Sequence, residues 1–335
     1  MQKVKMKEGF YKIRGKDVDM MGMVFPMVSE FKVGASGGYV TVDGTAVAGF
    51  PDRNIKIKCE SPSSYELVDS SVATTTREET DDETIERMRE RFDMLEDMTK
   101  ACKRGDVRAM IVSGPPGVGK SHGVEKVLGK HDLIADIAGV PSKYQVVKGA
   151  MSAIGLYCKL FNYADKDNVL VFDDCDSVFS DELSLNILKA ALDSKKNRTI
   201  HWNTDSFKLR NEGVPDSFTF KGSAIFITNI KFDNVKSKKM RDHLTALESR
   251  CHYIDLTIDT DREKMLRIKQ ITNDGMLDSY KLEDEVVQDI VDFIDINKTK
   301  LRELSLRTVL KVADLAKAFP TKWEAMAENT VMSRA

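Results

Sequence analysis

Residues 114–121 have the composition of a loop that holds phosphate. Glycines let backbone N–H groups turn inward around a phosphate, Lys120 reaches the terminal phosphates, and the Ser121 hydroxyl can ligate Mg²⁺. An apolar stretch leads into the loop and a helical stretch that begins near His122 leads out, so a helix directs its positive end at the anion. The predicted nucleotide-binding run, which fits the pattern G-x-x-x-x-G-K-[ST] in full, is Gly114-Pro115-Pro116-Gly117-Val118-Gly119-Lys120-Ser121, followed by His122.

Two acids end a second apolar run. Val169–Phe172 has the composition of a buried strand, and Asp173 and Asp174 follow it directly. A nucleotide site with Mg²⁺ needs a carboxylate at the tip of a strand next to the phosphate loop. We therefore expect Asp173 to hold the Mg²⁺ shell and Asp174 to orient or deprotonate the attacking water. The alternative is that both acids simply occupy a turn.

These residues must be positioned by a sheet. Short apolar runs alternate with helical patterns, which is typical of a parallel sheet covered on both faces. The predicted strands are Val107–Val112, Tyr144–Val147, Val169–Phe172, Ala224–Thr228 and Tyr253–Leu256, and the clearest helix is Asp181–Asp193. An earlier helical stripe predicts core packing of Ile85, Met88, Phe92, Leu95 and Cys102.

The flanking segments have other patterns. Residues 1–60 predict a small β-rich module, with a hairpin of Tyr39–Val42 and Thr45–Val47 around Asp43-Gly44. Residues 61–80 are rich in Ser, Thr and acids and predict a linker. Residues 81–260 are then predicted to form an α/β nucleotide-binding domain. Residues 261–335 carry only helical patterns and predict a domain of four short helices.

With these motifs in place, residues 85–330 resemble the AAA+ ATPase family of P-loop NTPases. The stretch 225–229 resembles the sensor-1 strand, which ends at Asn229. The stretch 247–251 resembles the arginine-finger segment, with Arg250 as the finger and a Ser-Arg-Cys core of the clamp-loader form. Residues 304–308 resemble sensor 2, with Arg307 as its arginine, and the helices after 261 resemble the family's lid.

The resemblance implies ATP and Mg²⁺ as cofactors and ATP hydrolysis as the activity. Asn229 would help to position the attacking water, and Arg250 would reach the nucleotide of a neighbouring subunit, which implies a homo-oligomeric ring or helical assembly. Each role has an ordinary alternative. Asn229 can satisfy backbone groups at a strand end, and Arg250 can be a surface arginine. Arg302 is a second candidate for the sensor-2 arginine. Ser305 could cap the helix that follows it, which would place Arg307 in the first turn of that helix.

Two features depart from the family pattern. The acid after the Mg²⁺ ligand is usually Glu, whereas this sequence has Asp174, which changes the reach of the carboxylate by one methylene. The N-terminal β module is foreign to clamp loaders. The layout is similar to that of compact AAA+ proteins carried by tailed phages, which would place the protein in the host cytoplasm.

Composition excludes several classes of protein. The 335 residues contain 51 Lys and Arg against 53 Asp and Glu, a formal net charge of -2, which argues against coating nucleic acid by bulk charge. No apolar run approaches the roughly 20 residues of a membrane helix, and the N-terminus has no apolar segment of a secretory signal. The five cysteines contain no C-x-x-C pair, so we expect reduced thiols in a cytoplasmic protein.

We therefore expect ATP hydrolysis coupled to the remodelling of a macromolecule, and three forms remain open. The first is a motor or loader in nucleic-acid metabolism. The second is a protein-remodelling ATPase, although the loop 148–157 has no aromatic residue at its tip for threading a chain. The third is an ATP-gated switch with little turnover. For the first form, residues 198–222 predict a β-hairpin with Lys208 and Arg210 at a basic tip that contacts DNA phosphates.

Overall fold

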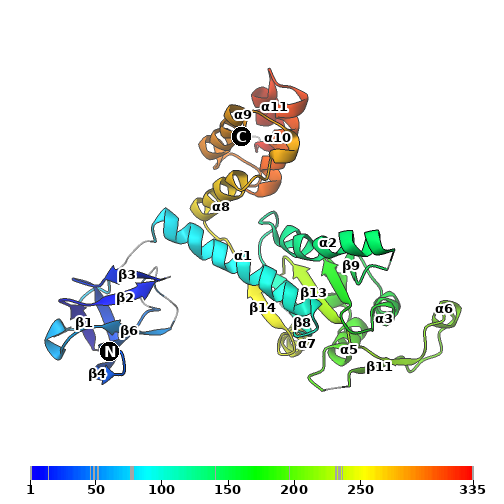
Figure 1. Cartoon of the computed structure of the whole chain (residues 1–335), viewed down its shortest axis with the longest axis horizontal. Coiled ribbons are helices and arrows are strands. Elements are labelled where there is room, and N and C mark those ends of the chain that lie inside the picture. Colours follow the sequence, from blue (N-terminus) through cyan, green and yellow to red (C-terminus); the bar gives the residue numbers. More distant parts are fainter. Residues whose placement is uncertain are drawn as a thin grey trace. The chain divides into compact units, whose positions relative to one another are not determined.

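The computed structural model describes residues 2–333 except 14, 46, 48, 49, 51, 52, 76–78, 140, 196, 231, 233, 234 and 236, and only the backbone at 16, 130–138, 239 and 240. By its internal contacts the chain divides into two compact units, residues 1–83 and 84–335 (Figure 1). No helix within the described ranges is long and apolar enough to cross a membrane.

The first unit is an antiparallel sheet of seven strands in the order β3-β2-β6-β5-β4-β1-β7. Its core contains the fully buried side chains of Val4, Phe25, Val40 and Ile57. The strands are β1 Lys3–Met6, β2 Phe10–Ile13, β3 Lys16–Asp19, β4 Val24–Gly34, β5 Gly37–Asp43, β6 Asn54–Lys58 and β7 Tyr65–Val68, with the 3-10 turn η1 Pro62–Ser64 before β7.

The hairpin predicted around Asp43-Gly44 has a different second strand. Tyr39–Val42 lies in β5, but Thr45 and Val47 are not in a strand, and Ala46 lies outside the described residues. β5 instead pairs with β6, where Val42 lies opposite Ile55. Asp43 is the last residue of β5 and Gly44 forms a bend after it, and the alternating burial of β6 fits a strand with one face in the core.

The predicted linker, residues 61–80, also contains a strand. β7 pairs antiparallel with β1, and Met6 lies opposite Tyr65. The Ser-rich residues before it form η1, which Ser61 caps through its side chain. The composition of this stretch predicted a loop because the strand is short, and the backbone ladder to β1 rather than a buried face holds it in the sheet.

The second unit contains the predicted five-stranded parallel sheet, and this prediction is confirmed. Its order is β14-β8-β13-β10-β9. The strands are β8 Ala109–Ser113, β9 Tyr144–Lys148, β10 Val169–Asp173, β13 Ser223–Thr228 and β14 His252–Asp255. The helices around them are α1 Asp81–Lys103, α2 Lys120–Ala138, α3 Ala153–Asn162, α4 Ser177–Ser180, α5 Glu182–Ala191 and α7 Lys238–Glu248.

Helices cover both faces of this sheet. On one face, side chains of α3, α5 and α7 pack on Ile111, Phe172 and Phe226. On the other face, side chains of α1 and α2 pack on Val112 and Val171. Strands that are buried on both faces are apolar along their length, so side chains that could bind a ligand or react are found at the strand ends.

The strand register brings the carboxyl ends of four strands to one edge. Thr228 of β13 and Asp255 of β14 both lie opposite Ser113 of β8. Asp173 of β10 lies opposite Ile227 of β13. The loop after β8 and the acids after β10 therefore meet at the same edge of the sheet, where α/β sheets bind ligands.

A small antiparallel ribbon stands between α5 and β13. It consists of β11 Thr199–His201 and β12 Ser217–Thr219, with Ile200 opposite Phe218, so the predicted hairpin is present. Its tip carries a short helix, α6 Phe207–Asn211, rather than an open turn. The aromatic side chain of Phe218 packs against Tyr157 of α3 at a ring-centroid distance of 5.0 Å.

The chain ends in four helices, as their patterns predicted. They are α8 Asp261–Asn273, α9 Asp284–Asn297, α10 Leu306–Ala318 and α11 Trp323–Val331, with the 3-10 turn η3 Asp278–Tyr280 between α8 and α9. They share a core of their own, in which Ile290, Val309, Val312 and Ala327 are fully buried.

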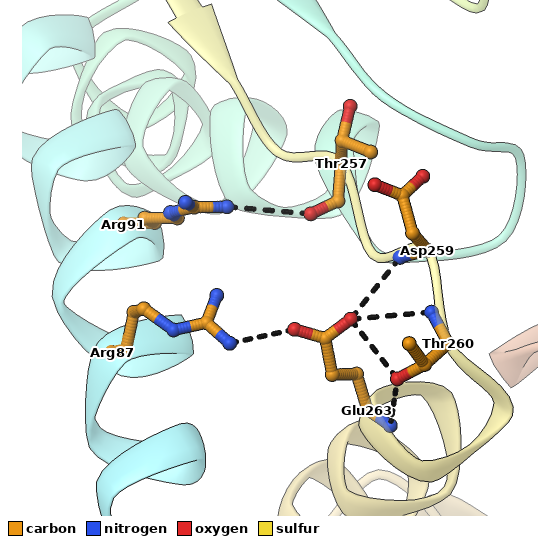
Figure 2. A network of polar contacts seen from close by, with 6 residues as sticks. All are labelled: Arg87, Arg91, Thr257, Asp259, Thr260 and Glu263. Carbon is orange, nitrogen blue, oxygen red and sulfur yellow. Dashed lines mark hydrogen bonds and ion pairs between the residues drawn. The ribbon is translucent and has the colours of Figure 1, made fainter. Parts of the chain in front are cut away.

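The segment between β14 and α8 is tied to α1 (Figure 2). Glu263 accepts a hydrogen bond from Arg87 at 2.6 Å and closes a capping box with Thr260 at the start of α8. Arg91 donates to the backbone carbonyl of Thr257 at 3.3 Å. Two arginines of α1 thus fix the point at which the chain leaves the sheet and enters the C-terminal helices.

Candidate functional site

A cavity of about 690 Å³ lies at the carboxyl edge of the parallel sheet. Its size falls in the range of small-molecule sites. Side chains from α1, the phosphate loop, α2, β10, β13, α8 and α10 line it. Among the residues predicted from the sequence, it brings together Gly117, Gly119, Lys120, Ser121, His122, Asp173, Asp174, Asn229 and Arg307.

Glycine is required in the phosphate loop. Gly117 has φ 71° and Gly119 has φ 101°, both in the left-handed range that side chains rarely adopt. A Cβ at Gly117 would lie 2.7 Å from the Cβ of Ser305, at the start of α10. The backbone N–H of Leu306 also donates to the carbonyl of Gly117 at 3.0 Å, so α10 rests directly on the loop.

Lys120 is buried in the loop. Its Nζ donates to the carbonyls of Gly114 and Pro115 at 2.7 and 2.8 Å and to Oδ1 of Asn229 at 2.8 Å. Burial lowers the pKa of Lys120 to about 8, and the positive charge of Arg307 acts in the same direction against the nearby acids. A bound polyphosphate would stabilise the charged form further, because an anion favours the protonated amine.

Ser121 and Asp173 form the predicted oxygen pair. The Ser121 hydroxyl donates to Oδ1 of Asp173 at 2.9 Å, and Asp173 is buried. Lys148 contacts the second carboxylate oxygen of Asp173 at 3.3 Å and also pairs with Glu125 at 3.0 Å. A hydroxyl and one carboxylate suit Mg²⁺, which takes one or two protein oxygens together with phosphates and water. Within the described residues no cluster of three or more His, Cys, Asp or Glu offers an all-protein metal site.

Asp174 faces the cavity from a left-handed backbone conformation. Its φ is 52°, a region that Asp adopts more readily than most residues. The Asn229 amide donates to Asp174 Oδ1 at 2.9 Å. Neighbouring Asp176 accepts a hydrogen bond from Thr228 at 2.7 Å, and burial raises the pKa of Asp176 against that bond. Asp174 is thus the acid of this turn that is open to a ligand.

Arg307 lies at the cavity with an exposed side chain. It occupies the first turn of α10, and no hydrogen bond or ion pair in the described part of the chain engages it. Its rival Arg302 donates instead to the backbone carbonyl of Met332 at 2.9 Å. Ser305 holds the predicted N-cap position, but its hydroxyl is buried and makes no capping hydrogen bond, because it packs against Gly117.

Several predicted residues lie outside the cavity lining. Gly114 and Pro115 contribute backbone carbonyls to Lys120, while Pro116 contributes nothing to the lining and Val118 packs in a small apolar cluster with Met88. Of the four x positions of the motif, Gly117 therefore contacts the cavity, whereas Pro115, Pro116 and Val118 do not line it.

Arg250 also lies apart from this cavity. It folds back over the end of α7, where it donates to the carbonyl of Ala246. Its Nε is buried without a partner. A cation at a helix C-terminus is stabilised by the helix dipole. Within one subunit, the position of Arg250 therefore needs no contact with a nucleotide to explain it.

Two residues of the cavity wall form a pair that the sequence analysis did not find. Phe92, from the stripe that predicted core packing, packs against two apolar clusters and also lines the cavity. Arg267 of α8 lines it too, and its guanidinium carbon lies 3.6 Å from the centroid of the Phe92 ring. The pairing joins residues far apart in the chain, so only a fold could reveal it.

Comparisons with known proteins place the chain in a family. No protein-family model matches the sequence. Two solved structures are similar: the replication initiator DnaA bound to AMPPCP and single-stranded DNA, 14% identical with a TM-score of 0.38 over 69% of this chain and 62% of that one; and domain III of the Thermotoga maritima replication initiation protein DnaA, 10% identical with a TM-score of 0.41 over 72% and 91%. Scores at this level support no conclusion about the present chain.

One relative has a much higher sequence identity than these two structures. The uncharacterized 36.7 kDa protein of the nrdC-mobD intergenic region of Enterobacteria phage T4 is 37% identical over 244 residues, which are 72% of this chain and 73% of the phage protein. Identity of this size over most of both chains reflects common descent, and the chain therefore belongs to the same family as this phage T4 protein.

Proposed function

We propose that the chain is an AAA+ ATPase that binds and hydrolyses ATP with Mg²⁺ in the cavity at the sheet edge. One observation carries the proposal: the phosphate-loop residues Lys120 and Ser121 are hydrogen-bonded to the strand-end residues Asn229 and Asp173. A phosphate loop alone only binds anions. Its connection to a carboxylate and an amide at the ends of neighbouring strands is what phosphoryl transfer to water needs.

The proposed roles follow from these contacts. Ser121 and Asp173 would hold Mg²⁺, which supplies charge neutralisation at the phosphates. Lys120 binds the terminal phosphates in place of the carbonyls it now contacts. Asp174 accepts the proton of the attacking water, and Asn229, which already donates to Asp174, holds that carboxylate in place.

The C-terminal helices fit the role of a lid. Arg307 reaches the cavity from α10, and Leu306 is hydrogen-bonded to the phosphate loop at Gly117. A change at the phosphates would therefore act on α10 directly. We propose residues 81–260 as the nucleotide-binding domain and 261–335 as the lid that moves with turnover.

Assembly would complete the site. In a homo-oligomer, Arg250 would leave the end of α7 and contact the nucleotide of the next subunit, where it would stabilise charge on the transferred phosphate. The Ser-Arg-Cys form of residues 249–251 supports a partner in nucleic-acid metabolism, and we propose a motor or loader acting on DNA as the first candidate.

A protein partner is the second candidate, and the hairpin favours it. Its predicted basic tip is neutralised: Arg210 pairs with Asp205 at 2.7 Å, and Lys208 approaches Glu212 at 4.0 Å. The side chain of Phe207, at the same tip, is 73% exposed. An exposed aromatic residue between balanced charges suits a protein surface better than a phosphate backbone.

Phosphate release by the purified protein tests these proposals. We expect Mg²⁺-dependent turnover that EDTA removes and that Lys120→Ala lacks. Stimulation by single- or double-stranded DNA would favour the first candidate, and its absence would favour the second. ATP binding without turnover under any of these conditions would instead identify an ATP-gated switch.

A further inference from the structure

Arg267 is a buried cation in the wall of the cavity. Only 6% of its surface is exposed, and its guanidinium stacks on the Phe92 ring at 3.6 Å. Nη1 donates to Oε1 of Gln270 at 2.9 Å, whereas Nε is buried and has no hydrogen-bond partner. The group is therefore held flat by an aromatic ring, with part of its donor capacity unused.

No carboxylate compensates this charge directly. Among the described residues no ion pair includes Arg267, and the charges of Asp274 and Asp93 act on it only from a distance. Burying a cation without an ion-pair partner is unfavourable, because the lost hydration is not replaced. The single neutral partner, Gln270, replaces only one of the five N–H donors of the guanidinium.

The guanidinium lies beside the phosphate loop. A Cβ at Gly119 would be 3.9 Å from Nη2 of Arg267 and 3.9 Å from Phe92, so both side chains border this glycine. Arg267 also lies apart from the residues proposed for hydrolysis. Asp173, Asp174 and Arg307 are close enough for their charges to act on Lys120, but none of the three is among the charged groups that act on Arg267.

We propose that Arg267 is a nucleotide-binding residue that contacts the phosphates which ADP and ATP share. The inference rests on the proposed nucleotide site and assigns to it a second arginine from the C-terminal helices, besides Arg307. Phe92 fixes the plane of the guanidinium, so that its unused donors face the phosphates bound over Gly119. The planar fork of arginine suits such contacts.

The test compares the affinities of ADP and ATP for Arg267→Met and for the wild type by isothermal titration calorimetry. Methionine keeps the length and the contact with Phe92 but removes the charge. We expect both nucleotides to bind about 10- to 100-fold more weakly, by the same factor, because one set of charged hydrogen bonds is lost. The melting temperature of the nucleotide-free variant should equal or exceed that of the wild type, because an uncompensated buried charge is removed.

Arg104→Met is the matched control. Its loss changes the net charge equally, but Arg104 is exposed, pairs with Asp106 and is not among the residues that line the cavity. Its effect on affinity should stay below about threefold. Unchanged ADP and ATP affinities in Arg267→Met would overturn the role of Arg267 but not the proposed function. A loss of affinity confined to ATP would also overturn it, because the arginine would then contact the terminal phosphate. Failure of the wild type to bind either nucleotide would overturn the proposed function itself.

Discussion

The side-chain amide of Asn229 donates to the carboxylate of Asp174 at 2.9 Å, and its carbonyl oxygen accepts from Lys120 at 2.8 Å. Only one orientation of the amide satisfies both bonds, because a lysine can only donate and a carboxylate can only accept. Asn229 therefore sets the distance between the phosphate-binding lysine and the proposed base. This relationship makes it a positioning residue.

Replacing Asn229 should separate binding from turnover. In Asn229→Ala we expect ATP affinity to change little and the maximal rate of phosphate release to fall on the order of 100-fold, because Asp174 loses its fixed orientation. Steady-state phosphate release and calorimetry measure the two effects. Asn211→Ala, at the tip of the hairpin, should change neither. A variant that lost affinity but kept its maximal rate would contradict the positioning role.

Arg250 can be tested for action between subunits. Arg250→Ala should bind ATP and turn it over on the order of a thousandfold more slowly. Mixing it with Lys120→Ala should recover activity, because a mixed interface joins the intact loop of one subunit to the intact arginine of the other. If both variants assemble and the mixture stays inactive, Arg250 serves only the end of α7, where it now donates to Ala246.

Nucleotide affinity should depend on pH through Lys120. Its pKa is lowered to about 8 by burial, and a bound polyphosphate favours the protonated form, so binding takes up a proton when the free amine is neutral. Affinity should be constant below about pH 8 and fall above it, approaching tenfold per pH unit. Calorimetry in buffers of different ionisation enthalpy should record uptake of about half a proton at pH 8 and about a tenth at pH 7. Equal uptake at both values would exclude Lys120 as its source.

The link between Arg87 and Glu263 should stabilise the fold above acidic pH (Figure 2). Burial opposes the charged form of Glu263, but hydrogen bonds from Arg87 and from the backbone N–H of Thr260 outweigh it and lower the pKa of Glu263. A lowered pKa means that this stability is fully present above the ordinary value near 4.5 and is lost as the pH falls below that value through the lowered pKa of the folded state.

Glu263→Gln should therefore lower the free energy of unfolding by about 1–2 kcal/mol at pH 7. Urea denaturation at pH 7 and pH 4 measures the change, and the difference from the wild type should shrink at pH 4. Glu285→Gln, in the first turn of α9 of the same bundle, is a control for loss of one carboxylate. A difference as large at pH 4 as at pH 7 would show that the charge of Glu263 does not carry the effect.

The sequence predicted the parallel sheet well because its strands are buried on both sides. Continuous apolar runs such as Val169–Phe172, each ended by polar residues, mark such strands without ambiguity. The phosphate loop was equally plain, since no other use requires its glycines at that spacing. The first unit was harder: in β7 the backbone ladder to β1 replaces a buried face, and a Ser-rich stretch before it suggests a loop.

Parts of the site had no sequence signal because they depend on contacts between distant segments. Phe92 fits the apolar stripe of α1, and nothing in that stripe specifies its contact with Arg267 of α8. The capping box of α8, formed by Thr260 and Glu263, was not predicted either, although its residues have the spacing that such boxes require. Its pairing with Arg87 has no such signal, because nothing local specifies that α1 runs beside it.

The assignment of Asp174 as the catalytic base can be tested by single-turnover hydrolysis in Asp174→Asn. The variant keeps the shape and the left-handed turn of Asp174 but cannot take a proton, so prebound ATP should be hydrolysed at least about 100-fold more slowly than by the wild type at equal affinity. Asp173→Asn, its neighbour, should instead weaken the Mg²⁺-dependent part of ATP binding. Hydrolysis of prebound ATP by Asp174→Asn at the wild-type rate would contradict the account, because the base would then lie outside the Lys120–Asn229–Asp174 chain.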